Sequence, residues 1–255
     1  MRQTLLFETA KDVNETVADL LEYRPNQPAG LKERSGDNIE GLRKIYSTRS
    51  TLDELVSNRS INKYKKKQLI FSEGNHATNL YFIVRGKVKT YKTNDYGKQL
   101  VLDLYTEHDF MGYIPLLENT FHKETAEALE ETEVAVIPRS EFEDLMLNNC
   151  EVRKMFIHLL AKNITENKKH LLGLAYNSLR KKVAEALLFI FSKYNANNNE
   201  NTPIEISRDN LAAIAGTATE SLIRTLTDFK NEKLIGIDNG IITIMNKKKL
   251  ENLID

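Results

Sequence analysis

The chain has 255 residues, enough for two domains of ordinary size, and its 36 basic residues are balanced by 36 acidic ones. This balance excludes a general polycation that coats nucleic acid, so any affinity for DNA has to come from the local placement of charge. The single cysteine, Cys150, excludes an internal disulfide framework and a cysteine-ligated iron–sulfur cluster within one chain. No apolar run approaches the roughly 20 residues of a membrane span, so we expect a cytoplasmic protein that does not enter a membrane.

Residues 1–45 are interpreted as a helical extension that is too short to be a domain. Apolar side chains between Leu6 and Leu21 recur at helical spacing, and Pro25 then ends the helix. The segment is either a linker or an arm that docks a partner. Residues 51–55 are expected to form a short helical lead-in to the next zone.

Residues 46–149 are expected to form a β domain. Short apolar runs recur there at near-regular spacing, separated by turn residues. The expected strands are residues 68–71, 80–84, 87–91, 100–104 and 134–137. Many short strands with this spacing predict a β-roll or jelly roll, and the helices that follow make the fold class α+β.

The pattern changes to helix after Ser140, with a short helix expected at residues 141–149 and a long one at residues 152–177. Apolar residues of the long helix recur every seven positions, which is typical of a two-stranded coiled coil. Residues 150–178 are therefore predicted to be a dimerisation helix, and its seam consists of Ile157, Leu160, Ile164, Asn167, Leu171 and Leu174. Asn167 is the polar member, which can fix the register of such a seam at a cost in stability. The alternative is a long helix that packs only within its own domain.

Residues 179–255 are expected to form a DNA-binding domain. Arg180–Lys182 is interpreted as a polar joint before a helix at residues 183–194, and residues 195–201 as an asparagine-rich loop. From Arg180 to the C-terminus there are 11 basic and 10 acidic residues. Even this domain is nearly neutral, so DNA affinity depends on which face carries the charge.

A helix-turn-helix is indicated within this domain. Ser207 is the expected cap of a first helix, and Gly216 supplies the positive φ that a tight turn needs. Thr217 or Thr219 is the expected cap of a second helix, whose polar face carries the residue types that read base edges and phosphates. The candidate DNA contacts are Arg208, Thr217, Thr219, Glu220, Ser221 and Arg224.

A hairpin is expected directly after the second helix. Asn239-Gly240 separates two β-branched runs, which is the strongest short hairpin signal, so the motif carries a wing. The alternative is a small helical subdomain with a charged surface. Lys247–Lys249 is a candidate phosphate contact, and a solvated helix face is an equally good interpretation of that triplet.

Together these features resemble the Crp/Fnr family of bacterial transcription regulators. The resemblance runs from about Leu52 to the C-terminus, and three sets of residues carry it: Ser72-Glu73-Gly74 before Leu80–Ile83, then Asp109–Gly112, and the pattern Leu211, Gly216, Glu220, Arg224. It implies a β-roll, a long dimerisation helix, a symmetric homodimer and a palindromic double-stranded DNA operator. RNA polymerase is a further candidate partner.

The ligand cassette is where the chain departs from that family. The resemblance implies a Glu for the ribose and an Arg for the cyclic phosphate, but the matching positions read Gly112-Tyr113 and Glu124-Thr125. A carboxylate facing a phosphate is repulsive. The candidate pocket, including a neighbouring cation and the long-helix positions, consists of Gly112, Tyr113, Lys123, Glu124, Thr125, Asn167 and Lys168. We therefore expect no response to cyclic AMP in the usual pose, and any other effector is unknown.

Other classes are less well supported by the sequence. The five histidines show no metal-ligand spacing, so neither a haem sensor, a metal site nor a metal enzyme on a jelly roll is expected. The chain is predicted not to be an enzyme and to need no cofactor. The alternative function is a regulatory module that does not bind DNA but senses another small ligand or docks a signalling partner.

Overall fold

The computed structural model describes residues 59–195 and 202–254. The helix expected near the N-terminus, the lead-in at residues 51–55 and most of the asparagine-rich loop lie outside these residues. By its internal contacts the described chain divides into two units, residues 145–161 in one and residues 59–144 with 162–254 in the other.

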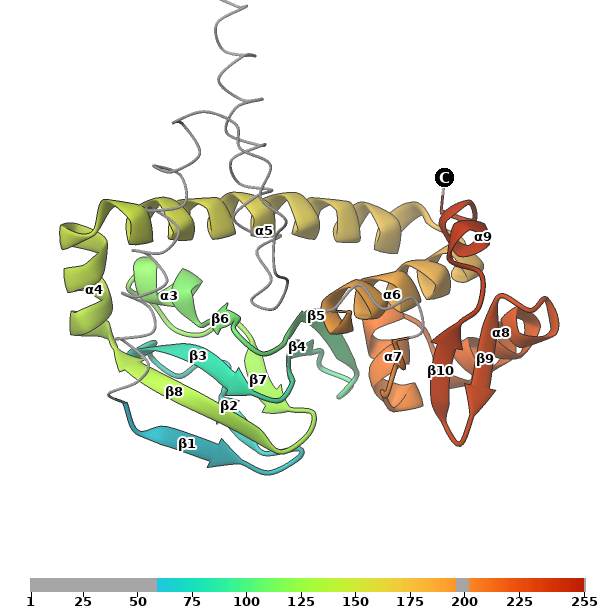
Figure 1. Ribbon diagram of the computed structural model, residues 1–255, viewed down its shortest axis with the longest axis horizontal. Coiled ribbons are helices and arrows are strands. Elements are labelled where there is room, and N and C mark those ends of the chain that lie inside the picture. The colour runs from blue at the N-terminus through green and yellow to red at the C-terminus, as the bar shows by residue number, and fades with distance from the viewer. Residues whose placement is uncertain (1–58, 196–201, 255) are drawn as a thin grey trace, which may run out of the picture. The chain divides into compact units, whose positions relative to one another are not determined.

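Two four-stranded antiparallel sheets form the β-roll (Figure 1). One has the order β1-β8-β3-β6 and the other β2-β7-β4-β5. The strands are β1 Ile61–Tyr64, β2 Leu69–Phe71, β3 Asn79–Arg85, β4 Val88–Thr93, β5 Gln99–Tyr105, β6 Phe110–Met111, β7 Thr125–Ala128 and β8 Thr132–Pro138. Inward side chains from both sheets, among them Ile83, Val88 and Met111, share one buried cluster. This cluster joins the two sheets of the roll.

The apolar runs correctly predicted β2, β3, β4, β5 and β8. Three strands were missed because their residues carry no apolar pattern. Strand β1 is an exposed edge strand, β6 has only two residues, and β7 buries only the small side chains Ala126 and Ala128. The short helix α3, Tyr113–Leu117, was also missed. The three strands form because neighbouring strands supply their hydrogen-bond partners, as β4 does for β7.

The helices after the roll are α4 Arg139–Asn148, α5 Cys150–Tyr176 and α6 Leu179–Tyr194. The prediction of a polar joint at Arg180–Lys182 was wrong, since these residues lie in the first turns of α6. The break lies at Asn177-Ser178, where the Ser178 hydroxyl accepts a hydrogen bond from the Lys181 amide at 3.4 Å. Lysine and arginine are good helix formers, so a basic triplet was a poor signal for a break in the helix.

The C-terminal part contains α7 Arg208–Ala215, α8 Thr219–Asn231, the hairpin β9 Ile235–Asp238 and β10 Ile241–Ile244, and α9 Lys247–Glu251. Asn239-Gly240 is the hairpin turn, and both residues have positive φ, as the sequence predicts. Helices α6, α7 and α8 and the hairpin share one apolar core. That core continues onto the roll through Tyr91, Val101 and Leu104 of β4 and β5.

Candidate functional site

A capped helix and a glycine turn set up the helix-turn-helix. The Ser207 hydroxyl accepts from the Asn210 amide at 3.2 Å, which fixes the start of α7. Gly216 ends that helix with φ of 61°, and the next amide, of Thr217, donates to the Ala212 carbonyl at 3.0 Å. A left-handed residue at this point turns the chain sharply, so α8 follows α7 within three residues.

The start of α8 differs from the expectation. Its N-cap is Ala218, whose side chain cannot cap, so neither Thr217 nor Thr219 has that role. The Thr219 hydroxyl instead donates to the Asp209 carboxylate of α7 at 3.0 Å. This contact ties the two helix starts together. Position 218 is in the extended conformation that any residue adopts, so residue type alone gave no signal for the cap.

Helix α8 buries one face and exposes the other. Its apolar side, Leu222, Leu226 and Phe229, lies in the core, while Glu220 and Arg224 are exposed and Thr219 and Ser221 are half-buried. Ile223 and Thr227 are also exposed, and with Glu220 and Arg224 they follow the helical spacing of one stripe. The sequence analysis overlooked these two residues, although their offset of three and seven from Glu220 could have identified them. The stripe offers a carboxylate, a guanidinium, a methyl-rich side chain and a hydroxyl.

Basic residues around the stripe differ in their exposure and in their ion-pair partners. Lys230 is exposed at the end of α8, whereas Arg180 is paired with Glu232 at 2.8 Å. Arg208 is half-buried, its Nη1 has no hydrogen-bond partner among the described residues, and burial lowers the pKa of its guanidinium. Arg208 is thus less accessible than the other candidate contacts. The Lys247–Lys249 triplet is exposed on α9, where the Asn246 side chain caps the helix.

The long helix α5 exposes a row of large apolar side chains. Ile157, Ile164 and Leu171 are 58%, 54% and 67% exposed, and they are spaced by seven residues. Asn167 is exposed as well, and its amide donates to the Asn163 side chain at 2.8 Å within the helix. Leu160 and Leu174 are half-buried. Exposed isoleucine and leucine at this spacing are unusual for a helix that has no partner.

The cassette positions lie at the start of α3 and before β7. Gly112 has φ of 80°, and a Cβ there would approach the Tyr81 ring to 3.0 Å. Tyr113 is buried, and burial raises the pKa of its hydroxyl to about 12. The Thr125 hydroxyl accepts from the Glu73 amide at 3.1 Å. A buried tyrosine thus stands where the resemblance implies a carboxylate.

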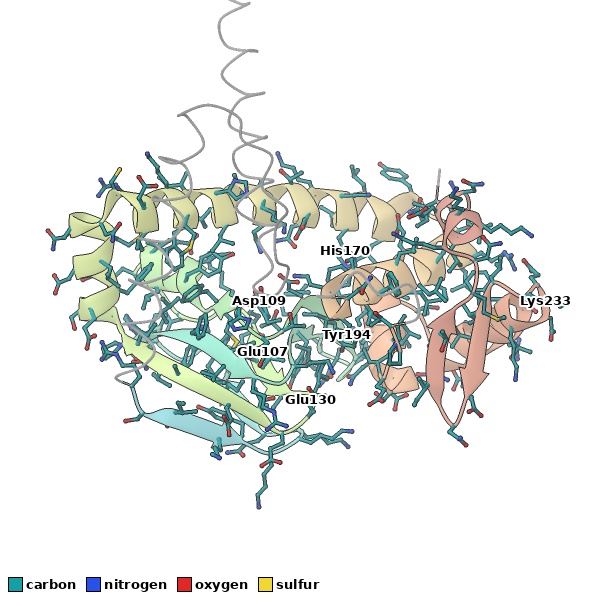
Figure 2. The ribbon with its side chains drawn as sticks, viewed as in Figure 1. Glu107, Asp109, Glu130, His170, Tyr194 and Lys233 are labelled. Carbon is teal, nitrogen blue, oxygen red and sulfur yellow. The ribbon has the colours of Figure 1, made fainter. Side chains whose placement is uncertain are left out.

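Glu124 lies in a cluster that already carries negative charge. Burial raises the pKa of its carboxyl to about 7, the neighbouring Asp103 adds to the rise, and the hydroxyl of Thr90 opposes it. Burial also raises the pKa of Asp109, whose carboxylate accepts from the Thr106 amide at 2.8 Å (Figure 2). The nearby cation is Lys193 of α6, which pairs with Asp103 at 3.2 Å. The arrangement favours a proton or a cation over a phosphate.

The remaining cassette residues do not neutralise the acidic cluster around Glu124. Lys123 is exposed and pairs with Glu118 at 2.8 Å, so it lies in solvent and is already engaged. Asn167 and Lys168 are exposed on α5. In the described part of the chain, no cluster of three or more His, Cys, Asp or Glu side chains has metal-binding geometry. None of the described helices combines the length and apolarity of a membrane span.

A β-roll, a long helix and a winged helix-turn-helix with an exposed polar stripe define a DNA-binding transcription regulator. Residues 61–149 match the cyclic nucleotide-binding domain family, and residues 181–253 match the Crp-like helix-turn-helix domain family. The chain belongs to the Crp/Fnr family, whose members are regulators and not enzymes. The resemblance and the α+β fold predicted from the sequence are therefore confirmed.

Individual relatives agree with this assignment. The cAMP-activated global transcriptional regulator CRP of Salmonella typhimurium is 25% identical over 199 residues, which span 77% of this chain and 95% of that protein. The anaerobic regulatory protein of Bacillus subtilis is 26% identical over 203 residues, 78% of this chain and 85% of that protein. FixK2 from Bradyrhizobium japonicum is similar in structure, with a TM-score of 0.69, 23% identity and coverage of 76% and 96%.

Proposed function

We propose that this regulator acts in the cytoplasm as a homodimer that reads a palindromic DNA site with the exposed stripe of α8. The observation that carries the proposal is that stripe, Glu220, Ile223, Arg224 and Thr227, which presents polar and methyl groups side by side on a helix that follows a tight turn. In related geometries the second helix of the motif enters the major groove.

Three residues of the stripe, Glu220, Ile223 and Arg224, have a chemical partner on a base edge. The Glu220 carboxylate accepts from a cytosine amino group, and the Arg224 guanidinium donates to a guanine or to a phosphate. Ile223 suits the methyl group of thymine. Ser221 is half-buried at the start of α8, where its hydroxyl suits a phosphate contact, whereas the Thr219 hydroxyl already donates to Asp209 and leaves its backbone amide for that role. Each good base contact is worth about 1–3 kcal/mol of discrimination.

Dimerisation follows from the apolar row on α5. Pairing of two helices along Ile157, Ile164 and Leu171 would bury side chains that are now more than half exposed. Such a pair places two recognition helices about 34 Å apart, one turn of DNA. The same surface explains Asn167, since a polar residue within an apolar seam sets the register.

The dimer is tested by changing the seam and measuring mass by sedimentation equilibrium. Ile164→Glu places a charge in the seam, and we expect a monomer that retains its thermal unfolding transition. Leu147→Glu is the matched control, because Leu147 is 74% exposed on α4 and outside the seam. A monomeric wild-type chain, or an Ile164→Glu variant that remains dimeric, would refute this interface.

The role of α8 as the recognition helix is tested by measuring binding to the duplex that the wild-type protein enriches from a random pool. Glu220→Ala and Arg224→Ala are expected to abolish specific binding and to leave the dimer intact. Lys248→Ala on α9 is the control for general loss of positive charge, and it should weaken binding to all sequences alike. Loss of the dimer in either α8 variant would show that the recognition helix is misplaced.

Cyclic AMP is not expected to bind the roll in the usual pose. The relative from Salmonella typhimurium is cAMP-activated, but in this chain Glu124 and Tyr113 occupy the cassette and the nearby charges are acidic. Thermal unfolding with cyclic AMP should therefore show no saturable stabilisation. A saturable shift at micromolar cyclic AMP would contradict the role given to these two residues.

A further inference from the structure

A cavity of about 430 Å³ lies outside the cassette, and the proposed function does not use it. It is bounded by β5, by the C-terminal half of α5, by α6 and by the end of α7. Of the cassette residues, only Asn167 lines it. Its volume falls within the roughly 300–1,000 Å³ that is usual for small-molecule sites.

The cavity is lined by apolar side chains and by polar or charged ones. Val101 of β5, Leu174 of α5, Phe189 of α6 and Ile214 of α7 supply the apolar wall. An apolar wall of this size suits the body of an organic ligand better than it suits a hydrated ion. The polar groups therefore decide which ligand fits.

His170 is the group with an unmet hydrogen bond. It belongs to α5 (Figure 2), and its Nε2 is buried without a partner among the described residues. Burial lowers the pKa of the imidazole, so the ring is neutral at pH 7 and one of its nitrogens accepts. A buried nitrogen without a partner is unfavourable, and a ligand that donates to it would remove that cost.

The charges that act on His170 are both negative. They come from Glu185 of α6 and Asp103 of β5, and both favour a positive charge at this point. Asp103 is paired with Lys193, whereas Glu185 is held by a hydrogen bond from the Asn177 amide at 2.8 Å. Glu185 is half-buried and has no cationic partner in the described ion pairs.

The other charged side chains of the cavity are held at its rim or point to solvent. Glu166 is paired with Lys162 at 3.8 Å, and Glu251 with Lys247 at 3.5 Å, each across one helical turn. Lys169 is exposed. Lys182 is half-buried on α6, but it is not among the groups that influence His170.

We propose that this cavity binds a small organic amine with an apolar body, its ammonium seated between His170 and Glu185. A protonated amine donates to the imidazole nitrogen and to the Glu185 carboxylate at once, and its body lies along the wall of Leu174, Phe189 and Ile214. A neutral or anionic analogue of the same shape lacks these charge-assisted contacts. Binding at this site can be measured without DNA, so it stands apart from the proposed function.

The test uses 4-phenylbutylamine as the probe and the full chain, with thermal unfolding and calorimetry. We expect a saturable rise in Tm and one bound amine per chain. The matched probes 4-phenylbutanol and 4-phenylbutyrate keep the apolar body and should bind much more weakly. Glu185→Gln can still accept the hydrogen bond from Asn177. This variant should lower the affinity for the amine by about tenfold or more, the loss expected for a charge-assisted hydrogen bond.

Two further variants locate the site. Glu166→Gln, at the rim, should leave the amine affinity within about twofold, since exposed charges contribute little. His170→Leu removes the acceptor and serves as the second inner variant if Glu185→Gln does not fold. The proposal is overturned if the alcohol or the carboxylate binds as well as the amine, or if no saturable binding occurs at millimolar probe. An amine affinity that is unchanged in both inner variants would also overturn it.

Discussion

Replacing Glu124 with glutamine should stabilise the protein at high pH and have almost no effect at low pH. The folded carboxyl has a pKa of about 7, against an ordinary value of 4.5, because it is buried near Asp103. The folded state therefore binds this proton more tightly than the unfolded chain does. Ionising the group costs folding free energy that is absent below pH 4.5, grows as the pH rises and is complete above pH 7.

The magnitude follows from the two pKa values. Their difference corresponds to roughly 3 kcal/mol at pH 8 and to less than about 1 kcal/mol at pH 5. Glutamine is nearly isosteric and carries no charge, so it removes the cost at every pH. The Glu124→Gln variant should thus gain about 3 kcal/mol in unfolding free energy at pH 8 and little at pH 5.

Denaturant unfolding of the wild type and the variant at both pH values tests this expectation. Glu118→Gln is the control, because that exposed carboxylate pairs with Lys123 in solvent and should change stability by no more than about 0.5 kcal/mol. An equal effect of Glu124→Gln at pH 5 and pH 8, or a loss of stability at pH 8, would refute the reasoning. Either result would mean that the carboxylate is ionised and well solvated in the fold.

Two further substitutions test the packing around the helix-turn-helix. Gly216→Ala should lower the free energy of unfolding by about 1–2 kcal/mol because position 216 has a left-handed φ. The loss should exceed that of Gly97→Ala, because a Cβ at 216 meets Leu174 at 2.6 Å while Gly97 faces open space. Equal losses in thermal unfolding would argue against close packing at the turn. Lys89→Met removes a buried ammonium that lies 3.3 Å from Glu127 and donates to Asn210 at 2.8 Å. We expect a loss of about 3–5 kcal/mol. In the exposed Lys63, which pairs with Glu133, the same change should cost much less stability, and similar losses for both lysines would contradict a buried role for Lys89.

Local sequence signals determined much of the fold. Strands β3 and β5 were predictable because their apolar residues form compact runs, and the hairpin was predictable because Asn239-Gly240 is a strong turn signal. Strand β7 was not, since Ala126 and Ala128 are too small to mark a core and are buried only because β2 and β4 pair on both sides. Its existence depends on partners far away in the sequence.

In the candidate site, too, local features were predictable and features that depend on distant residues were not. Spacing alone located α8 and its outward residues, since a helical period is a local property. Sequence could not show that Ala218 precedes α8 while Thr219 bonds to Asp209, because either threonine has a capping side chain. Nor could it show that Glu124 lies near Asp103, which is 21 positions earlier and comes close only when β5 folds into the roll.

Selection of bound duplexes from a random DNA pool by the purified full chain tests the central claim most directly. A dimer that reads DNA through α8 should enrich a palindrome whose half-sites lie about ten base pairs apart. Enrichment of a single half-site without symmetry, or binding with no sequence preference, would contradict a symmetric dimer that reads DNA through α8.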